Sequence, residues 1–396
     1  MSLQSTPSAN RLHIGIFGKR NSGKSSLINA ITNQSTALVS EVAGTTTDPV
    51  YKAMEIRGLG PCMLIDTAGF DDVGRLGELR MQKTREALEK TDIAVLVCAS
   101  EPLELERRWV ELFRERNLPI LAVINKADLL GDAGRLALHI RQQLGLEPLL
   151  ASAKERTGIQ ELIAALVKNR PEGFGEQTLT GDLARDGDVV LLVMPQDIQA
   201  PQGRLILPQV QTIRELLDKR CTVVGTTADR LDRALAALAA PPRLIITDSQ
   251  VFPQVCAQKP PESLLTSFSV LMAGLKGDLQ VFAQGAQAID TLTGSSRVLI
   301  AEACTHAPQE EDIGRVKIPR LLRQRAGEGL SVQVVCGPDF PEDLSGYDLI
   351  IHCGACMFNR RYVLSRIHRA QAQGVPITNY GIAIAKLTGI LDQIAL

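Results

Sequence analysis

The first 170 residues alternate short apolar segments with amphipathic ones. Segments such as Leu12–Phe17, which has a single His, and Ile93–Cys98 are almost wholly apolar, which is typical of strands buried on both faces of a parallel sheet. Glu104–Arg116 instead spaces its apolar residues as a helix does and predicts a charged surface helix. The alternation predicts a doubly wound α/β domain. The strands expected in it are Leu12–Phe17, Tyr51–Ile56, Cys62–Ile65, Ile93–Cys98, Ile120–Ile124 and Pro148–Leu150.

The same alternation resumes after a polar linker rich in Pro and Gly that follows Arg170. A second break at 258–261 divides the remainder, so we expect three α/β domains, at 8–170, 181–260 and 262–396. The middle one is expected to be a structural or dimerisation module. Its expected elements are strands Asp188–Met194, Thr222–Val224 and Leu244–Thr247 and helices Leu207–Lys219 and Leu231–Leu238; the third domain has strands Arg297–Ala301, Val332–Val335 and Leu349–His352.

Composition limits the class of protein. The 396 residues carry a net charge of −1 with the charges well mixed, so the field of the chain predicts no nucleic-acid partner. The polar start and the short apolar runs predict neither a secretory signal nor a membrane span. We therefore expect a cytoplasmic protein. Its eight cysteines do not form a disulfide framework in a chain of this length, and clustered ones point to metal or redox chemistry.

A phosphate-binding pattern follows the first predicted strand. Residues 18–26 read GKRNSGKSS and match G-x-x-x-x-G-K-[ST] between a strand and a helix. Lys24 would bring a positive charge to the β- and γ-phosphates, and the Ser25 hydroxyl would bind Mg²⁺. A Gly/Ser-rich turn that matches by accident is the alternative for this pattern alone. The residues expected to bind nucleotide here are Gly18, Asn21, Ser22, Gly23, Lys24, Ser25 and Ser26.

Three further motifs follow at the ends of later strands and argue against an accidental match. Asp66-Thr67-Ala68-Gly69 is a D-x-x-G, whose Asp would hold Mg²⁺ through water and whose Gly N–H would meet the γ-phosphate. Asn125-Lys126-Ala127-Asp128 is an N-K-x-D, whose carboxylate can accept both N1–H and the 2-amino group of guanine. Ser152-Ala153-Lys154 would meet the guanine O6. Four ordered motifs predict a GTPase that selects GTP over ATP.

With these motifs, Gly44-Thr45-Thr46-Thr47-Asp48 resembles the G-T-T-x-D switch of TrmE- and Era-type GTPases. The resemblance implies that Thr46 closes over Mg²⁺, with Thr45 as the less favoured alternative. It also implies that Asn21 helps to bind a K⁺ ion that bridges the phosphates and stimulates hydrolysis. The residues expected to act in catalysis are then Lys24, Thr46, Asp66 and Gly69. Phe70 stands where Ras-like GTPases have a water-orienting Gln, so no such group is identified.

Two cysteine and histidine motifs end strands of the third domain. Cys304-Thr305-His306 follows the first of these strands, and His352-Cys353-Gly354-Ala355-Cys356 follows the third. Thiolates from neighbouring strand ends can surround one inorganic centre. The pattern favours an iron–sulfur cluster, with a zinc site and chance cysteines as the alternatives.

The C-x-H motif, followed after 45 residues by H-C-x-x-C behind a GTPase domain, resembles the HydF family of [FeFe]-hydrogenase maturation GTPases. The resemblance covers essentially the whole chain. It implies a scaffold that binds a [4Fe–4S] cluster on Cys304, Cys353 and Cys356. The scaffold would receive a two-iron precursor made with two radical-SAM maturases and deliver it to the apo-hydrogenase. It also implies a homodimer formed through the middle domain.

Three points stay open. With three cysteines in the motifs, His306 or His352 is the candidate for the fourth iron corner, by direct ligation or by orienting the thiolates, and Cys336 is a weaker candidate. The alternative function is a ribosome-assembly or RNA-modification GTPase with a zinc-binding third domain. The basic residues near the cluster motifs are a solvated face or an attractive patch for an anion, and they are Arg315, Lys317, Arg320, Arg323, Arg325, Arg360, Arg361, Arg366 and Arg369.

Overall fold

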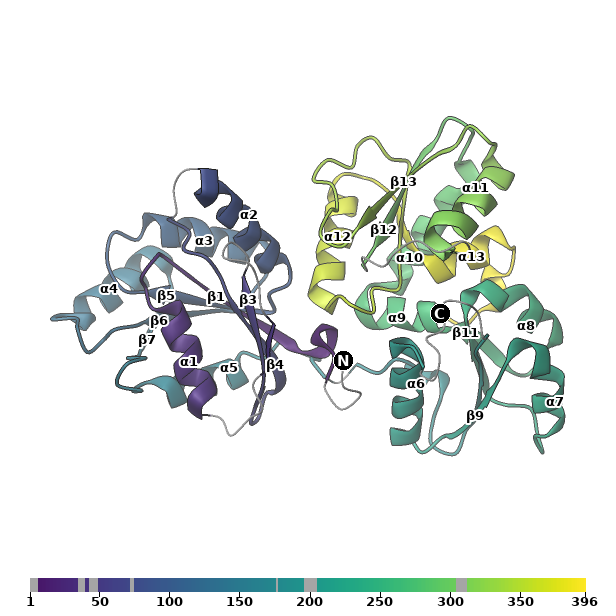
Figure 1. The fold of residues 1–396 in the computed structure, drawn as a ribbon, viewed down its shortest axis with the longest axis horizontal. Coiled ribbons are helices and arrows are strands. Elements are labelled where there is room, and N and C mark those ends of the chain that lie inside the picture. Colours follow the sequence, from purple (N-terminus) through teal and green to yellow (C-terminus); the bar gives the residue numbers. More distant parts are fainter. Residues whose placement is uncertain are drawn as a thin grey trace. The chain divides into compact units, whose positions relative to one another are not determined.

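The computed structural model describes residues 6–34, 40–42, 49–71, 75–175, 177–195, 205–303 and 312–396. The chain forms two compact units, Met1–Gly175 and Glu176–Leu396 (Figure 1). Among the predicted site residues, Thr46, Cys304 and His306 lie outside the described residues. All other predicted site residues lie within them.

The first unit is built on a seven-stranded mixed sheet of order β2-β3-β4-β1-β5-β6-β7. β3 is antiparallel to both β2 and β4, and the remaining pairs are parallel. Because β1 lies near the centre, its carboxyl end meets those of β4 and β5. The strands are β1 (Leu12–Gly18), β2 (Ser40–Val42), β3 (Val50–Ile56), β4 (Gly60–Asp66), β5 (Ile93–Cys98), β6 (Ile120–Ile124) and β7 (Leu149–Leu150).

Helices cover both faces of this sheet, as its buried parallel strands require. Leu27 and Ile31 of α1 and Leu162 of α5 pack on one face. Phe113 of α3 and Ile140 of α4 pack on the other face. The helices are α1 (Lys24–Gln34), α2 (Arg75–Glu89), α3 (Glu104–Glu115), α4 (Ala133–Leu144) and α5 (Ile159–Lys168).

The second unit contains two four-stranded parallel sheets. The first of them has the order β11-β10-β8-β9 and consists of β8 (Val189–Val193), β9 (Thr222–Thr226), β10 (Leu244–Thr247) and β11 (Leu264–Ser267). Its helices are α6 (Leu207–Asp218), α7 (Leu231–Ala236), α8 (Phe252–Gln258) and α9 (Phe268–Lys276). The break at 258–261 precedes β11, so this sheet extends past the expected boundary to Ser267.

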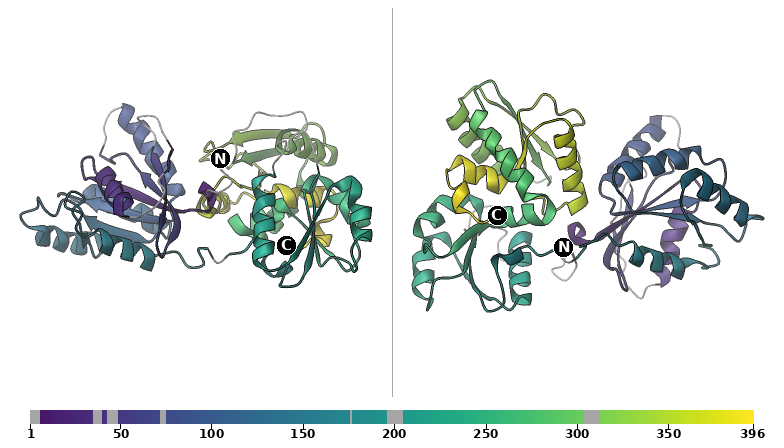
Figure 2. Two further views of the ribbon diagram at one scale, coloured as in Figure 1. Left: turned by 60° about the horizontal axis from the view of Figure 1, so that its bottom comes forward. Right: turned by 180° about the vertical axis from the view of Figure 1, so that it is seen from behind.

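The other sheet of the second unit has the order β13-β12-β14-β15. It consists of β12 (Arg297–Glu302), β13 (Ser331–Cys336), β14 (Leu349–His352) and β15 (Ile377–Asn379). Its helices are α10 (Leu279–Ala286), the π-helical turn Ile313–Lys317 with α11 (Ile318–Ala326), α12 (Arg360–Ala372) and α13 (Tyr380–Leu387). Because all four strands are parallel, their carboxyl ends lie at one edge (Figure 2).

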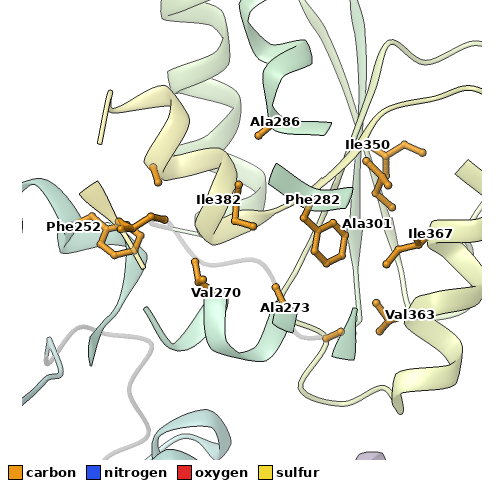
Figure 3. Close-up of a cluster of buried hydrophobic side chains, with 14 of the residues drawn as sticks. Phe252, Val270, Ala273, Phe282, Ala286, Ala301, Ile350, Val363, Ile367 and Ile382 are labelled. Carbon is orange, nitrogen blue, oxygen red and sulfur yellow. The ribbon is translucent and has the colours of Figure 1, made fainter. Parts of the chain in front are cut away.

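One apolar core joins these two sheets. Phe252 of α8 and Val270 of α9 belong to the same buried cluster as Phe282 of α10 and Ile367 of α12 (Figure 3). The chain end adds a second link, because the Ala395 N–H donates to the Leu265 carbonyl of β11 at 2.7 Å. The second and third expected domains therefore pack as one compact unit, and the predicted α/β class is confirmed for the whole chain.

Candidate functional site

The phosphate loop lies between the end of β1 and the start of α1, as predicted. Its backbone takes positive φ angles at Asn21 (59°) and Gly23 (90°). A Cβ atom on Gly23 would lie 2.2 Å from the side-chain nitrogen of Asn125. One on Gly18 would lie 2.5 Å from the carbonyl oxygen of Val97. Only glycine fits at these two positions, so the sequence pattern has a steric cause and permits the tight curvature of a phosphate-binding loop.

Lys24 is the buried cation of this loop, with 7% of its surface exposed. Its Nζ donates to the carbonyl oxygens of Gly18 at 3.0 Å and Lys19 at 2.9 Å. Ser25 and Ser26, the next two residues of α1, are exposed. The loop therefore gathers an ammonium, two hydroxyls and the positive end of α1 in one place, which suits a polyphosphate.

Two of the three residues predicted around Mg²⁺, Ser25 and Asp66, contact each other. Asp66 ends β4, which pairs with β1, and its carboxylate accepts a hydrogen bond from the Ser25 side chain. Burial raises the pKa of Asp66, while this bond and the charges of Lys24 and Lys52 lower it. A carboxylate beside a hydroxyl is a hard oxygen donor set, so these residues fit Mg²⁺.

The D-x-x-G segment folds against the phosphate loop. A Cβ atom on Gly69 would lie 2.6 Å from the backbone nitrogen of Arg20. That N–H donates to Asp71 Oδ1 at 2.5 Å. Phe70 is 4% exposed and stacks on Trp109 with their ring centroids 5.5 Å apart. Phe70 therefore belongs to the core and does not orient water in this conformation.

The base-recognition motifs also converge. Asn125 is buried, and its Nδ2 donates to the carbonyl oxygens of Ser22 at 3.0 Å and Gly23 at 3.3 Å. Its Oδ1 accepts the Ala153 N–H at 3.1 Å. The Ser152 hydroxyl donates to Asp128 Oδ1 at 2.5 Å. Asn125 therefore connects both base motifs to the phosphate loop. Lys126 has a positive φ of 61°, and Lys154 is exposed.

A second candidate site lies at the carboxyl edge of the sheet that contains β12. In the strand register Glu302 of β12 is opposite Cys336 of β13, and His352 of β14 is opposite Asn379 of β15. Four polar or thiol side chains therefore end four neighbouring strands. The sequence predicted the thiol and the imidazole at this edge but did not predict Glu302 or Asn379.

Cys353 is already surrounded by backbone donors. Its Sγ accepts the N–H of Ala303 at 3.0 Å and that of Ala355 at 3.4 Å, and Ala355 has a φ of 52°. Ala303 is the residue directly before the predicted motif that begins at Cys304, so the described chain leading to that motif contacts this sulfur. N–H groups directed at a sulfur stabilise a thiolate ligand, and this donor set fits an iron–sulfur cluster.

Cys356 is half-buried against the apolar cluster that contains Met272, and neither Cys353 nor Cys356 forms a disulfide with a described residue. Among the described residues no three His, Cys, Asp or Glu side chains are placed to share a metal ion. Cys304 is outside these residues, so the described structure contains two of the three predicted ligands.

His352 is wholly engaged by protein groups. Its Nε2 lies 3.0 Å from Nη1 of Arg366, and its Nδ1 lies 2.9 Å from the carbonyl oxygen of Cys353. Since a guanidinium only donates, Nε2 accepts and the proton sits on Nδ1. Burial, together with the charge of Arg366, lowers the pKa of His352 to about 3. The imidazole is therefore neutral and fixes the carbonyl of the C-x-x-C turn.

Arg366 itself is 1% exposed and enclosed by aromatic rings. Its guanidinium carbon lies 4.8 Å from the ring centroid of Phe340, 4.7 Å from that of Phe358 and 4.8 Å from that of Tyr362. This corrects the expectation of a solvated or ligand-attracting Arg366. The signal in the sequence was its helical spacing from Tyr362, Val363 and Ile367, which share the buried face of α12.

Other basic residues of the expected patch are also structural. Arg360 donates to the carbonyl oxygens of Leu275 at 3.0 Å and Gly277 at 2.9 Å, at the end of α9. Arg315 pairs with the buried Glu302 at 3.1 Å and donates to Cys336 Sγ at 2.8 Å. Burial and Glu302 raise the pKa of the Cys336 thiol. Cys336 is thus held by a charged pair, which disfavours it as a cluster ligand.

Three comparisons with known proteins define the class. A family model of 50S ribosome-binding GTPases matches residues 13–126. GTPase Der of Wolinella succinogenes is 40% identical over 123 residues, which are 30% of this chain and 26% of that protein. The tRNA modification GTPase MnmE of Chromobacterium violaceum is 37% identical over 159 residues, which are 40% of this chain and 34% of that protein. The first domain is therefore a P-loop GTPase domain.

The remaining residues identify the family. The hydrogen maturase F dimerization domain matches 179–277, and the hydrogen maturase F tetramerization domain matches 280–395. Together with the GTPase domain, these matches place the chain in the family of HydF-type hydrogenase maturation GTPases.

The similarity to whole proteins is more limited. The chain spans about a third or less of the length of the two GTPases named above. A crystal structure of Era with MgGDPNP and a 16S ribosomal RNA segment aligns with 58% of this chain and 98% of its own, at 18% identity and a TM-score of 0.35. None of the described helices is both long and apolar enough for a membrane span.

Proposed function

We propose that this chain hydrolyses GTP and carries a [4Fe–4S] cluster as a scaffold in the maturation of [FeFe]-hydrogenase. The observation that carries the proposal is the hydrogen bond from the N–H of Ala303, the residue before the first thiol motif, to Cys353 Sγ of the second motif. The same chain brings its base and phosphate motifs together in the first domain. The two motif sets belong to separate compact units of one polypeptide. The apo-hydrogenase and two radical-SAM maturases are the partners implied by the family.

In the GTPase half, each residue has a distinct task. Lys24 binds the β- and γ-phosphates, Ser25 and Thr46 bind Mg²⁺, Asp66 holds the Mg²⁺ hydration shell, and Gly69 meets the γ-phosphate. Asp128 reads the guanine, with Asn125 and Ser152 holding its loop in place. Asn21, at the turn of the phosphate loop, would bind K⁺, which would take the role of an arginine finger.

In the second half, Cys304, Cys353 and Cys356 would hold the cluster. A bound [4Fe–4S] cluster would supply an iron corner without a cysteine, at which a ligand of the precursor can exchange. The amides of Ala303 and Ala355 favour thiolate at Cys353. His352 acts by orienting the C-x-x-C turn, because both its nitrogens already have protein partners. His306 then stays the histidine candidate for the fourth corner.

The RNA-modification alternative has one observation in its favour, the similarity to MnmE. That similarity covers 40% of this chain, and the two hydrogen maturase F domains account for residues beyond the GTPase domain.

The cysteines among the described residues, including the buried Cys62 and Cys98, form no disulfide with one another. Thiols of this kind are typical of a reducing compartment, and we propose the cytoplasm.

The proposal is tested on anaerobically purified full-length chains by iron, sulfide and zinc content and by hydrolysis of GTP and ATP. Cys304→Ala, Cys353→Ala and Cys356→Ala should each lose most of the iron, while the matched control Cys336→Ala should keep it. Every variant should hydrolyse GTP and spare ATP. Stoichiometric zinc with little iron in the wild type, or equal hydrolysis of ATP, would contradict the proposal.

A further inference from the structure

Helix α3 carries an acid on its apolar face. Trp109, Val110 and Phe113 of this helix are buried, and so is Glu106, three residues before Trp109, with 1% of its surface exposed. A buried carboxylate is costly unless it is paired. The other first-turn acid, Glu104, is exposed to solvent and follows the usual pattern. The burial of Glu106 therefore calls for a partner inside the domain.

The partner is a residue of the phosphate loop. Lys19 Nζ lies 3.0 Å from Glu106 Oε2, and the Lys19 side chain is 16% exposed. The same ammonium donates to the carbonyl oxygen of Pro102, in the segment that leads into α3. Burial raises the pKa of Glu106, and Lys19 lowers it. An ion pair so well shielded from solvent restrains its two side chains, and the segments that carry them, more firmly than a surface ion pair does.

Lys19 also supports the loop through its backbone. Its carbonyl oxygen accepts Lys24 Nζ at 2.9 Å and the Ser22 N–H at 3.3 Å. The Lys19 side chain thus fixes the residue whose carbonyl holds the phosphate-binding ammonium. Glu106 does not line the nucleotide site, but it is connected to it through Lys19 and Lys24.

The same helix has a second link to the site. Phe70, directly after D-x-x-G, stacks on Trp109 at 5.5 Å and an interplanar angle of 22°. Trp109 stacks in turn on Phe17 of β1 at 5.5 Å and 28°. Offset stacks of this kind add to the energy of burial and have a preferred geometry. Helix α3 therefore touches both segments that contact the γ-phosphate in GTPases.

We infer that α3 positions the nucleotide site, with Glu106 and Trp109 as positioning residues for GTP binding and hydrolysis. Glu106 sets the phosphate loop through Lys19, and Trp109 sets the D-x-x-G segment through Phe70. A shift of α3 would therefore move both segments together. This inference rests on the proposed GTPase activity.

The test compares Glu106→Gln with Glu104→Gln, an identical change on the exposed side of the same helix. Glu106→Gln leaves the Lys19 charge without its anion, so the GTP dissociation constant should rise roughly tenfold or more. Lys19→Met should have a similar effect, and the double variant should lose less than the sum of the two single losses. Glu104→Gln should match the wild type in both KM and kcat.

Trp109 is the sole tryptophan, so its fluorescence reports on α3 directly. Its emission should change when GTP binds to the wild type, and Phe70→Leu should remove most of that change. Lys19→Met decides the matter if Glu106→Gln does not fold. If the Lys19→Met and Glu106→Gln variants both bind GTP with the dissociation constant of the wild type, the inference is overturned. A wild type that binds no GTP would instead overturn the proposed function.

Discussion

Arg366 shows how a single residue can couple a buried charge to a ligand site. Its cation is desolvated among three rings, a setting in which each contact contributes about 1–2 kcal/mol. It donates to His352, and His352 holds the Cys353 carbonyl. Positive charge beside a cluster favours the reduced, more negative state. Arg366 would therefore raise the reduction potential of the proposed cluster.

Arg366→Met should lower that potential, on the order of tens of millivolts, because it removes the charge and frees His352 Nε2. The measurement is a redox titration followed by EPR. Arg369→Met, one turn further along α12 at a partly exposed site, is the matched control and should leave the potential in place. Equal potentials in the wild type and Arg366→Met would contradict this role.

At this scale the sequence predicted residues whose motif has a steric or chemical cause. Gly23 and Asn125 lie against each other as the phosphate and base motifs require. Glu106 and Arg366 could not be found by motif, since a charged residue on a helix is ordinarily taken as exposed. Their positions on the apolar faces of α3 and α12 were the available signal.

At the scale of elements, hydrophobic runs predicted the central strands well. Ile93–Cys98, Ile120–Ile124 and Leu244–Thr247 begin and end where expected, because they are buried on both faces. β2, β11 and β15 were not predicted, since each is short and has only one or two apolar residues. β11 also follows a Pro-Pro pair that reads as a boundary.

Strand β9 is an edge element of the dimerization domain. The Thr222 N–H donates to the Asp188 carbonyl, and the Thr226 carbonyl accepts the Met194 N–H, both on the side of β8. Because backbone groups alternate in direction along a strand, those of Val223 and Gly225 point away from β8. Such an edge is a template for pairing with a second chain. We propose that β9 takes part in the homodimer.

Val223→Pro should then weaken the dimer, because proline removes an outward N–H without touching the bonds to β8. Val223→Ala loses the same side-chain packing and keeps that N–H, so it should remain dimeric. Light scattering coupled to size-exclusion chromatography measures both. A fully dimeric, folded Val223→Pro variant would place the interface elsewhere.

At the scale of the whole molecule, the chain joins a GTPase domain to the two oligomerisation domains of the hydrogen maturase F family. The GTPase domain was predictable because four motifs occur in a fixed order. The proposed cluster ligands could be predicted from the sequence only as a pattern of thiols. The contact between Ala303 and Cys353 depends on the pairing of strands β12 and β14, which the sequence pattern does not specify. The central claim is that this edge holds an iron–sulfur cluster.

The most direct measurement is the EPR spectrum of the full-length chain, purified without oxygen and reduced with dithionite, with metal and sulfide counted on the same sample. We predict the signal of a reduced [4Fe–4S] cluster and about four irons and four sulfides per chain. An EPR-silent protein with one tightly bound zinc would contradict the account.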